Sequence, residues 1–147
     1  MHEPNVSRQD TKTPGEPELP VKYEYNPELR IIHTCPYGDL LIDDIVSYFN
    51  EVAKDIEIHS GVIEVVHFDN VENYLFSSND ALQIPGQYEE MKVKKNIKCT
   101  IFIGEDDIHY GVARMFQNLF GVDDRHYDMF VVRTEAEATD LIKNING

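Results

Sequence analysis

The feature that most limits the fold is a nearly continuous run of apolar and β-branched residues from Val62 to Phe68. A run of this kind is typical of a strand covered on both faces, as in a parallel sheet with helices on each side. Two further apolar runs of strand length follow at residues 97–103 and 127–132. We therefore expect an α/β domain built on a largely parallel sheet.

Segments with the apolar spacing of helices separate these strands. The first begins after Gly38, where Asp39 is a candidate N-cap. Its apolar face is formed by Leu41, Ile45, Tyr48, Phe49 and Val52. The second segment contains Pro85, which would cost about 3 kcal/mol inside a helix that began at Ser78. We therefore place the start of this helix near Pro85 and expect residues 77–82 to be irregular or extended.

The last two helices carry capping signals at their starts. Asp106 or Asp107 can cap the third helix, which Gly121 ends. Thr134 and Glu137 form a capping box at the start of the final helix. The expected buried stripes are Ile108, Val112, Met115 and Leu119 on the third helix and Ala138, Leu141, Ile142 and Ile145 on the last.

The N-terminal part divides into an arm and a hairpin. Residues 1–20 contain four of the seven prolines and few large apolar side chains, so we expect a disordered arm followed by one domain over residues 21–147. Two strand-like segments are joined at residues 26–28, where Pro27 suits a turn. The full expectation is a mixed sheet with an N-terminal hairpin and about four helices, in the order ββαβαβαβα.

Composition argues against several classes of partner. The chain has 13 Lys and Arg against 27 Asp and Glu, a net charge of −14, which repels nucleic-acid phosphates and anionic lipid surfaces. No apolar run approaches the roughly 18 residues of a membrane span, so we expect no integral membrane segment and a cytoplasmic location. Cys35 and Cys99 lie in apolar segments and are expected to be buried thiols.

We find no motif for catalysis, metal binding or a cofactor. The sequence has no CxxC, HExxH, P-loop, GxSxG or GxGxxG motif, and His33 and His67 fall within expected strands. Three carboxylates at residues 105–107 would repel a phosphate at that helix start and instead complement its dipole. We therefore expect a protein that is not an enzyme, with no catalytic residues, metal or cofactor.

Two segments resemble a known family. Residues 25–30, Tyr-Asn-Pro-Glu-Leu-Arg, look like the opening strand-turn-strand of the SpoIIAA-like branch of STAS domains. Residues 111–116, Gly-Val-Ala-Arg-Met-Phe, look like its third helix, and the likeness spans roughly residue 23 to the C-terminus. The resemblance implies a bacterial STAS-like fold of the kind found in anti-sigma-factor antagonists, in a branch that is mostly uncharacterised.

The resemblance also implies a candidate phosphorylation switch. In the antagonists a strand is followed by Asp-Ser-Ser-Gly, and the first serine is phosphorylated by a partner kinase. The matching residues here are Phe76, Ser77, Ser78 and Asn79. The two serines are kept, whereas the flanking aspartate and glycine are replaced. In the alternative interpretation, Ser77 and Ser78 satisfy backbone groups in a turn.

These observations lead to two functional hypotheses. The first is a non-enzymatic regulatory or protein-interaction domain with an unidentified protein partner, and a homodimer is left open. In it, Arg114 either pairs with a buried carboxylate or recognises a carboxylate or phosphate of the partner. The alternative is a binder of a small apolar ligand or lipid in a pocket between the sheet and the helices. The expected lining is Phe102, Met115, Phe116, Phe120 and Met129.

Overall fold

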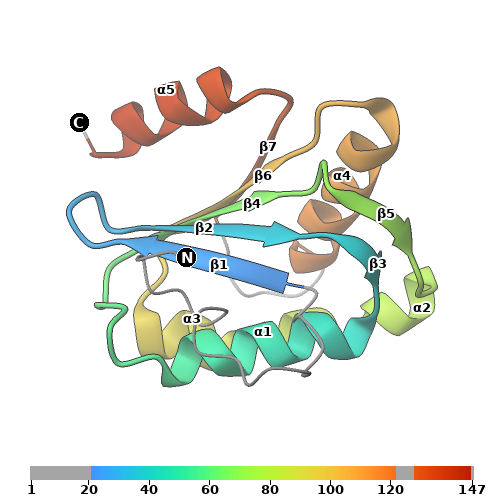
Figure 1. The fold of residues 1–147 in the computed structure, drawn as a ribbon, viewed down its shortest axis with the longest axis horizontal. Helices are drawn as coiled ribbons and strands as arrows, with labels where there is room; N and C mark the ends of the chain where they lie inside the picture. Colours follow the sequence, from blue (N-terminus) through green and yellow to red (C-terminus); the bar gives the residue numbers. More distant parts are fainter. Residues whose placement is uncertain (1–20, 122–127, 147) are drawn as a thin grey trace, which may run out of the picture.

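The computed structural model describes residues 21–121 and 128–146, arranged around one main sheet (Figure 1). The five strands of this sheet lie in the order β1-β2-β4-β6-β7, with β1 antiparallel to β2 and all other neighbours parallel. The strands are β1 (Val21–Asn26), β2 (Ile31–Pro36), β4 (Ile63–His67), β6 (Cys99–Ile103) and β7 (Met129–Val132). The expected N-terminal arm, residues 1–20, lies outside the described residues.

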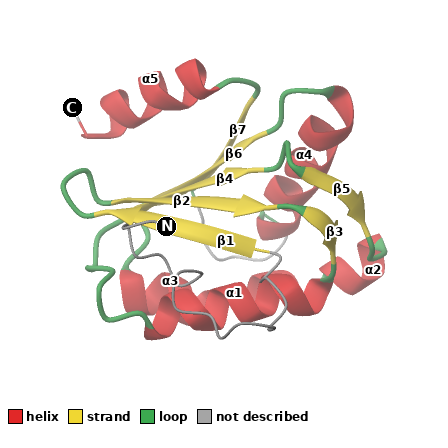
Figure 2. Ribbon diagram, in the orientation of Figure 1, coloured by secondary structure: helices red, strands yellow, loops and turns green. Residues whose placement is uncertain are grey.

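Helices lie on both sides of the sheet, with α5 on one side and α1 and α3 on the other (Figures 1 and 2). The long helices are α1 (Ile42–Lys54), α3 (Ile84–Lys95), α4 (Asp107–Phe120) and α5 (Glu135–Asn146). Side chains of α1, α3 and α4 belong to the larger apolar cluster, and those of α5 to the smaller one. The sheet is therefore covered on both faces, as the apolar run around β4 predicts.

The expected order of the main elements is confirmed. β1, β2, α1, β4, α3, β6, α4, β7 and α5 follow one another as ββαβαβαβα. The antiparallel pairing of β1 with β2 is the expected hairpin, and the parallel pairs of β2, β4, β6 and β7 are the expected crossovers. The mixed α/β architecture predicted from the sequence is therefore correct.

A second, two-stranded sheet was not predicted. β3 (Gly38–Leu40) pairs in parallel with β5 (Val71–Tyr74) beside the main sheet. Asp39 lies within β3, so its assignment as the N-cap of α1 is wrong. The N-cap is Leu41, whose backbone N–H donates to a carboxylate oxygen of Asp44 at 2.9 Å. The cap is thus supplied from inside the helix, because the preceding residues are held in a strand.

The segment around the serine pair also differs from the expectation. Residues 78–81 form a short helix, α2 (Ser78–Ala81), where an irregular or extended connection was predicted. Ser77 caps this helix, and Asp80 completes a capping box with it. The prediction for α3 is confirmed, because Pro85 lies in its first turn, where its missing N–H costs nothing.

α4 is rotated relative to the predicted stripe. Its buried residues are His109, Ala113, Phe116 and Phe120, whereas Val112, Met115 and Leu119 are only partly buried against the larger cluster. Ile108 is 71% exposed, so its placement in the stripe is wrong. His109 is buried on this helix, and its ring Nδ1 lies 2.6 Å from the hydroxyl of Tyr74. That polar contact has no signature in apolar periodicity.

The remaining helix signals are confirmed. Asp106 caps α4 by accepting a hydrogen bond from the backbone N–H of His109 at 2.8 Å, and Gly121 follows the last turn. Thr134 and Glu137 form the predicted capping box of α5. On α5, Ala138 is buried, and Leu141, Ile142 and Ile145 pack against the smaller cluster.

A candidate ligand pocket with a buried carboxyl group

An apolar pocket lies between the main sheet and helices α1, α3 and α4. The atom-free space in and around it is about 510 Å³, part of it open solvent, and the centre of a water-sized sphere can lie anywhere within about 60 Å³ of it. Since one water needs about 10–15 Å³ by a measure of this kind, the inner space exceeds a single water. The apolar side chains that line it include Leu40, Phe49, Val66, Phe68, Phe102, Phe116, Phe120 and Met129.

This position agrees with the pocket expected from the sequence. Of the five side chains predicted to line it, Phe102, Phe116, Phe120 and Met129 do so. Met115 does not line the pocket. It is only partly buried, and its sulfur lies 4.0 Å from the hydroxyl of Ser78. The difference follows from the rotation of α4, which points Phe116 and Phe120 toward the sheet.

The wall of the pocket on the sheet side contains one carboxyl group, Glu64. Its side chain is almost completely buried, with 2% of the residue's surface exposed. The two carboxyl oxygens accept hydrogen bonds from Tyr48 and from Thr100, the latter at 2.7 Å. Glu64 and Thr100 are register partners on the adjacent strands β4 and β6, so the pairing of these strands fixes their contact.

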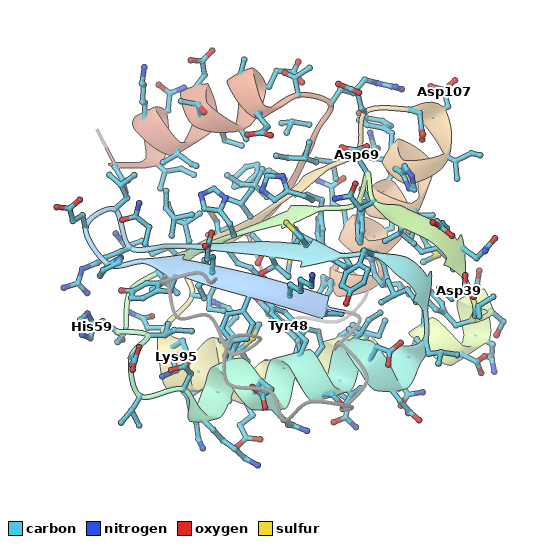
Figure 3. The ribbon with its side chains drawn as sticks, in the orientation of Figure 1. Asp39, Tyr48, His59, Asp69, Lys95 and Asp107 are labelled. Atoms are coloured by element: carbon cyan, nitrogen blue, oxygen red, sulfur yellow. The ribbon has the colours of Figure 1, made fainter. Side chains whose placement is uncertain are left out.

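Two further hydroxyl groups extend this network. The hydroxyls of Thr34 and Tyr48 lie 2.6 Å apart, and those of Tyr88 and Thr100 lie 3.2 Å apart. Tyr48 reaches from α1 toward the sheet (Figure 3), and Tyr88 comes from α3. When Glu64 is ionised, Thr34 can donate to Tyr48 and Tyr88 to Thr100, so that every hydroxyl of the network points its hydrogen toward the carboxylate. We call these five residues the Glu64 network.

Burial and hydrogen bonding act in opposite directions on Glu64. Burial raises the pKa of the Glu64 carboxyl above its usual value, and the hydrogen bonds from Tyr48 and Thr100 lower it by a smaller amount. Burial, followed by the nearby charge of Glu64, raises the pKa of Tyr48 well above its usual value. Tyr48 therefore stays protonated and acts as a donor, while Glu64 is easier to protonate than an exposed glutamate.

No lysine, arginine or histidine occurs among the described residues that line the pocket. Lys95, which is also buried, donates to the backbone oxygens of Asp55 and Ile58 at 2.7 and 2.9 Å. These contacts tie the loop after α1 to the end of α3, at the place labelled in Figure 3. Glu64 is therefore a buried acid that accepts hydrogen bonds from two neutral hydroxyl groups.

Sequence patterns did not reveal Glu64 as a site residue. The other members of the Glu64 network come from β2, α1, α3 and β6, and no spacing along the chain connects them. The signal that could have found it is a single glutamate within an otherwise apolar strand, since Asp and Glu are almost never fully buried unless they are paired. The structure shows that this glutamate points inward.

The serine pair lies at the molecular surface. Ser77 and Ser78 are both exposed. The hydroxyl of Ser77 accepts from the backbone N–H of Asp80 at 3.0 Å, and its own N–H donates to the Asp80 carboxylate at 3.2 Å. Ser77 thus has the backbone-capping role of the alternative interpretation, and its position also leaves its hydroxyl accessible to an enzyme.

Arg114 is exposed on α4. The hypothesis of a buried ion pair for this residue is therefore wrong, because the rotation of α4 turns it toward solvent. A role in recognising a partner stays a prediction. On the same helix, Tyr110 packs under the guanidinium of Arg133, whose centre lies 4.1 Å from the ring centroid.

The two strand histidines meet on the face of the sheet opposite the pocket. His33 Nδ1 lies 3.3 Å from His67 Nε2. Burial, and then the proximity of His33, lower the pKa of His67. Cys99 is buried as expected, whereas Cys35 is only partly buried, and both are free thiols. Among the described residues, no group of three or more His, Cys, Asp or Glu side chains is placed to hold a metal ion.

Within the ranges that the structure describes, no helix is both long enough and apolar enough to cross a bilayer. Neither the sequence profiles of known families nor the sequences of curated proteins match the chain.

Among solved structures, the chain is similar to an uncharacterised protein of the DUF3478 family from Shewanella loihica, described as having a SpoIIAA-like fold. The two chains share 15% sequence identity, and the match covers 76% of this chain and 83% of the other, with a TM-score of 0.49. This level of similarity assigns no role to any residue of this chain. The fold is described from the order and pairing of its own strands.

Proposed function

We propose that this protein is a non-enzymatic binding module that takes a small, largely apolar ligand in the pocket between the main sheet and helices α1, α3 and α4. The observation that supports this function is the pocket itself, an apolar space larger than one water within an otherwise close-packed core. Most ligand sites combine an apolar lining with a few placed polar groups, and the Glu64 network supplies such groups here.

Two neighbouring residues on β4 provide a matched test. Val66 lines the pocket, whereas Val65 lies on the opposite face of the same strand, in the smaller apolar cluster. Val66→Phe would fill part of the pocket, and Val65→Phe would add the same volume to the opposite face, outside this pocket. We expect benzene to raise the melting temperature of the wild type and of Val65→Phe, and to have no effect on Val66→Phe.

Protein made in cells should first be inspected for a bound molecule by native mass spectrometry. A co-purified mass below about 300 Da that is lost in Val66→Phe and kept in Val65→Phe supports the proposal. Failure of benzene to stabilise the wild type, together with an absence of any bound mass, would refute it. The same spectra report whether the chain is a monomer or a homodimer.

A second candidate function, a regulatory protein-interaction domain, is supported by the surface around α2. Leu75 and Leu82 flank the serine pair and are 50% and 58% exposed. The large negative charge of the chain favours a partner with a basic surface. Phosphorylation of Ser77 would add about −1.5 to −2 charges next to Asp80 and oppose contact with an apolar surface. This site would therefore act as a release switch.

The serine hypothesis can be tested with two variants of one residue. Ser77→Asp should reduce capture of the partner, and Ser77→Ala should preserve it, with both variants folded by circular dichroism. Ser78→Asp is the control for a nonspecific effect of added charge, and Arg114→Ala tests the proposed recognition by α4. Equal capture by Ser77→Asp and Ser77→Ala would leave Ser77 with its capping role alone.

A further inference from the structure

The Glu64 network indicates which chemical group the pocket would receive. Each carboxylate oxygen has two lone pairs, and one oxygen accepts a hydrogen bond from Tyr48 and the other from Thr100. The carboxyl group therefore has acceptor capacity left, and Glu64 is one of the residues that line the pocket.

The charge of Glu64 further limits which ligand group can bind beside it. A buried carboxylate is costly unless it is paired with a cation or takes up a proton. The described lining contains no cationic side chain, and Lys95 is bound to backbone oxygens elsewhere. In the free protein a proton can neutralise Glu64. In the complex, a positively charged ligand group can do so and can also donate hydrogen bonds to both oxygens.

The rest of the molecule is consistent with a cationic ligand. The net charge of −14 produces a negative field that attracts small cations and repels anions such as fatty-acid carboxylates. The apolar remainder of the lining, which includes Phe68, Phe102 and Phe116, requires that the charged group be attached to an apolar body. These aromatic rings lie within 6.1 Å of one another, centroid to centroid.

We propose that the ligand is a small lipophilic amine, bound as an ammonium ion with its charged group at Glu64 and its apolar body among the aromatic side chains. This inference rests on the proposed function, because it names the ligand class of the same pocket. No covalent bond between the ligand and the protein forms or breaks on binding. If Glu64 is protonated in the free protein, arrival of the ammonium ion releases one proton to the solvent.

Three probes of equal length test the proposal: n-butylamine, butan-1-ol and butyrate. Dissociation constants are measured by chemical-shift titration of the protein at pH 8 in about 150 mM salt, which weakens attraction by the surface charges. We expect the wild type to bind the amine at least about tenfold more tightly than the alcohol, a difference of about 1.4 kcal/mol, and butyrate most weakly.

Two charge-removing variants provide the control. Glu64→Gln keeps the shape of the side chain and removes the buried acid, whereas Glu24→Gln removes one exposed acid on β1, outside the pocket. We expect the preference for amine over alcohol to disappear in Glu64→Gln and to persist in Glu24→Gln. Because butan-1-ol should still bind to Glu64→Gln, its binding also shows that this variant is folded and its pocket intact.

The outcomes separate the two proposals. Equal binding of amine and alcohol by the wild type, or an unchanged preference in Glu64→Gln, overturns the amine assignment. If benzene binds and butylamine does not, the amine assignment fails while the apolar pocket stands. If neither benzene nor any of the three butyl probes binds, the proposed function itself fails.

Discussion

Tyr48→Phe is the substitution that most directly tests the energetics of the Glu64 network. It removes one buried hydroxyl that donates to Glu64 and lies 2.6 Å from the hydroxyl of Thr34. A hydrogen bond to a charged group contributes about 1.5–3 kcal/mol, and one between neutral groups about 0.5–1.5 kcal/mol. We therefore expect a loss of about 2–3 kcal/mol where Glu64 is ionised and of about 1 kcal/mol where it is protonated.

The sign of the pH dependence follows from the direction of the pKa shift. Because burial raises the pKa of Glu64 in the folded protein, the folded state holds its proton more tightly than the unfolded state. The contribution of Glu64 to stability is therefore greatest below its unfolded pKa, and it falls as pH rises toward the folded pKa. Tyr48→Phe removes a donor that favours the ionised form, so the variant should lose more stability than the wild type as pH rises.

Urea denaturation followed by circular dichroism at pH 5.5 and pH 8 measures both effects. Tyr88→Phe is the matched control, since its hydroxyl lies 3.2 Å from that of Thr100, whereas the hydroxyl of Tyr48 donates to Glu64 itself. We expect a smaller loss for Tyr88→Phe, about 0.5–1.5 kcal/mol, with little change between the two pH values. A loss for Tyr48→Phe that is below about 0.5 kcal/mol, or that is the same at both pH values, would refute the reasoning.

Three further results are expected from the structure. Phe116→Ala should cost about 3–5 kcal/mol in urea denaturation, as is usual for a buried aromatic residue, and a cost near zero would mean that α4 does not pack on the sheet. Gly104→Ala should destabilise the fold, because the added Cβ would lie 2.6 Å from the backbone carbonyl carbon of His109. Gly111→Ala lies in open space within α4 and should stabilise the fold by about 0.5–1 kcal/mol. Equal effects of the two substitutions would contradict the backbone positions described around these glycines. Burial lowers the pKa of His67, so protonation of His67 is unfavourable in the folded state and stability falls as the pH is lowered. His67→Gln should therefore reduce the stability that the protein loses between pH 7.5 and pH 5.5. An unchanged loss would show that His67 does not cause it.

Much of the fold could be predicted because its main elements carry periodic signals. The apolar runs of β4 and β6 and the capping residues Asp106 and Thr134 each act over a few neighbouring positions, and the structure confirms them. β3 and β5 have three and four residues and include exposed polar side chains, so they leave too short a pattern to detect. Their pairing depends on contacts between segments about 30 residues apart.

The candidate site could be predicted only in part, for a related reason. Phe116 and Phe120 recur at helical spacing along α4, and Phe102 lies within the apolar run of β6, so their general position was predictable from helix and strand periods. The orientation of α4 was not predictable in this way, and the side that is buried carries His109, which contacts Tyr74, together with Ala113, Phe116 and Phe120. Glu64 was missed because its partners are assembled by strand register and helix packing, and these are set by the whole fold.

The most direct test of the pocket is a crystal structure of the protein under xenon pressure. Xenon binds in apolar cavities that can exclude water, and its strong scattering locates it without prior assumptions. We predict a xenon site among Phe68, Phe102 and Phe116, and its loss in Val66→Phe crystals treated in the same way. Side chains that fill this space, with no xenon among them, would contradict the claim that the protein has a ligand pocket.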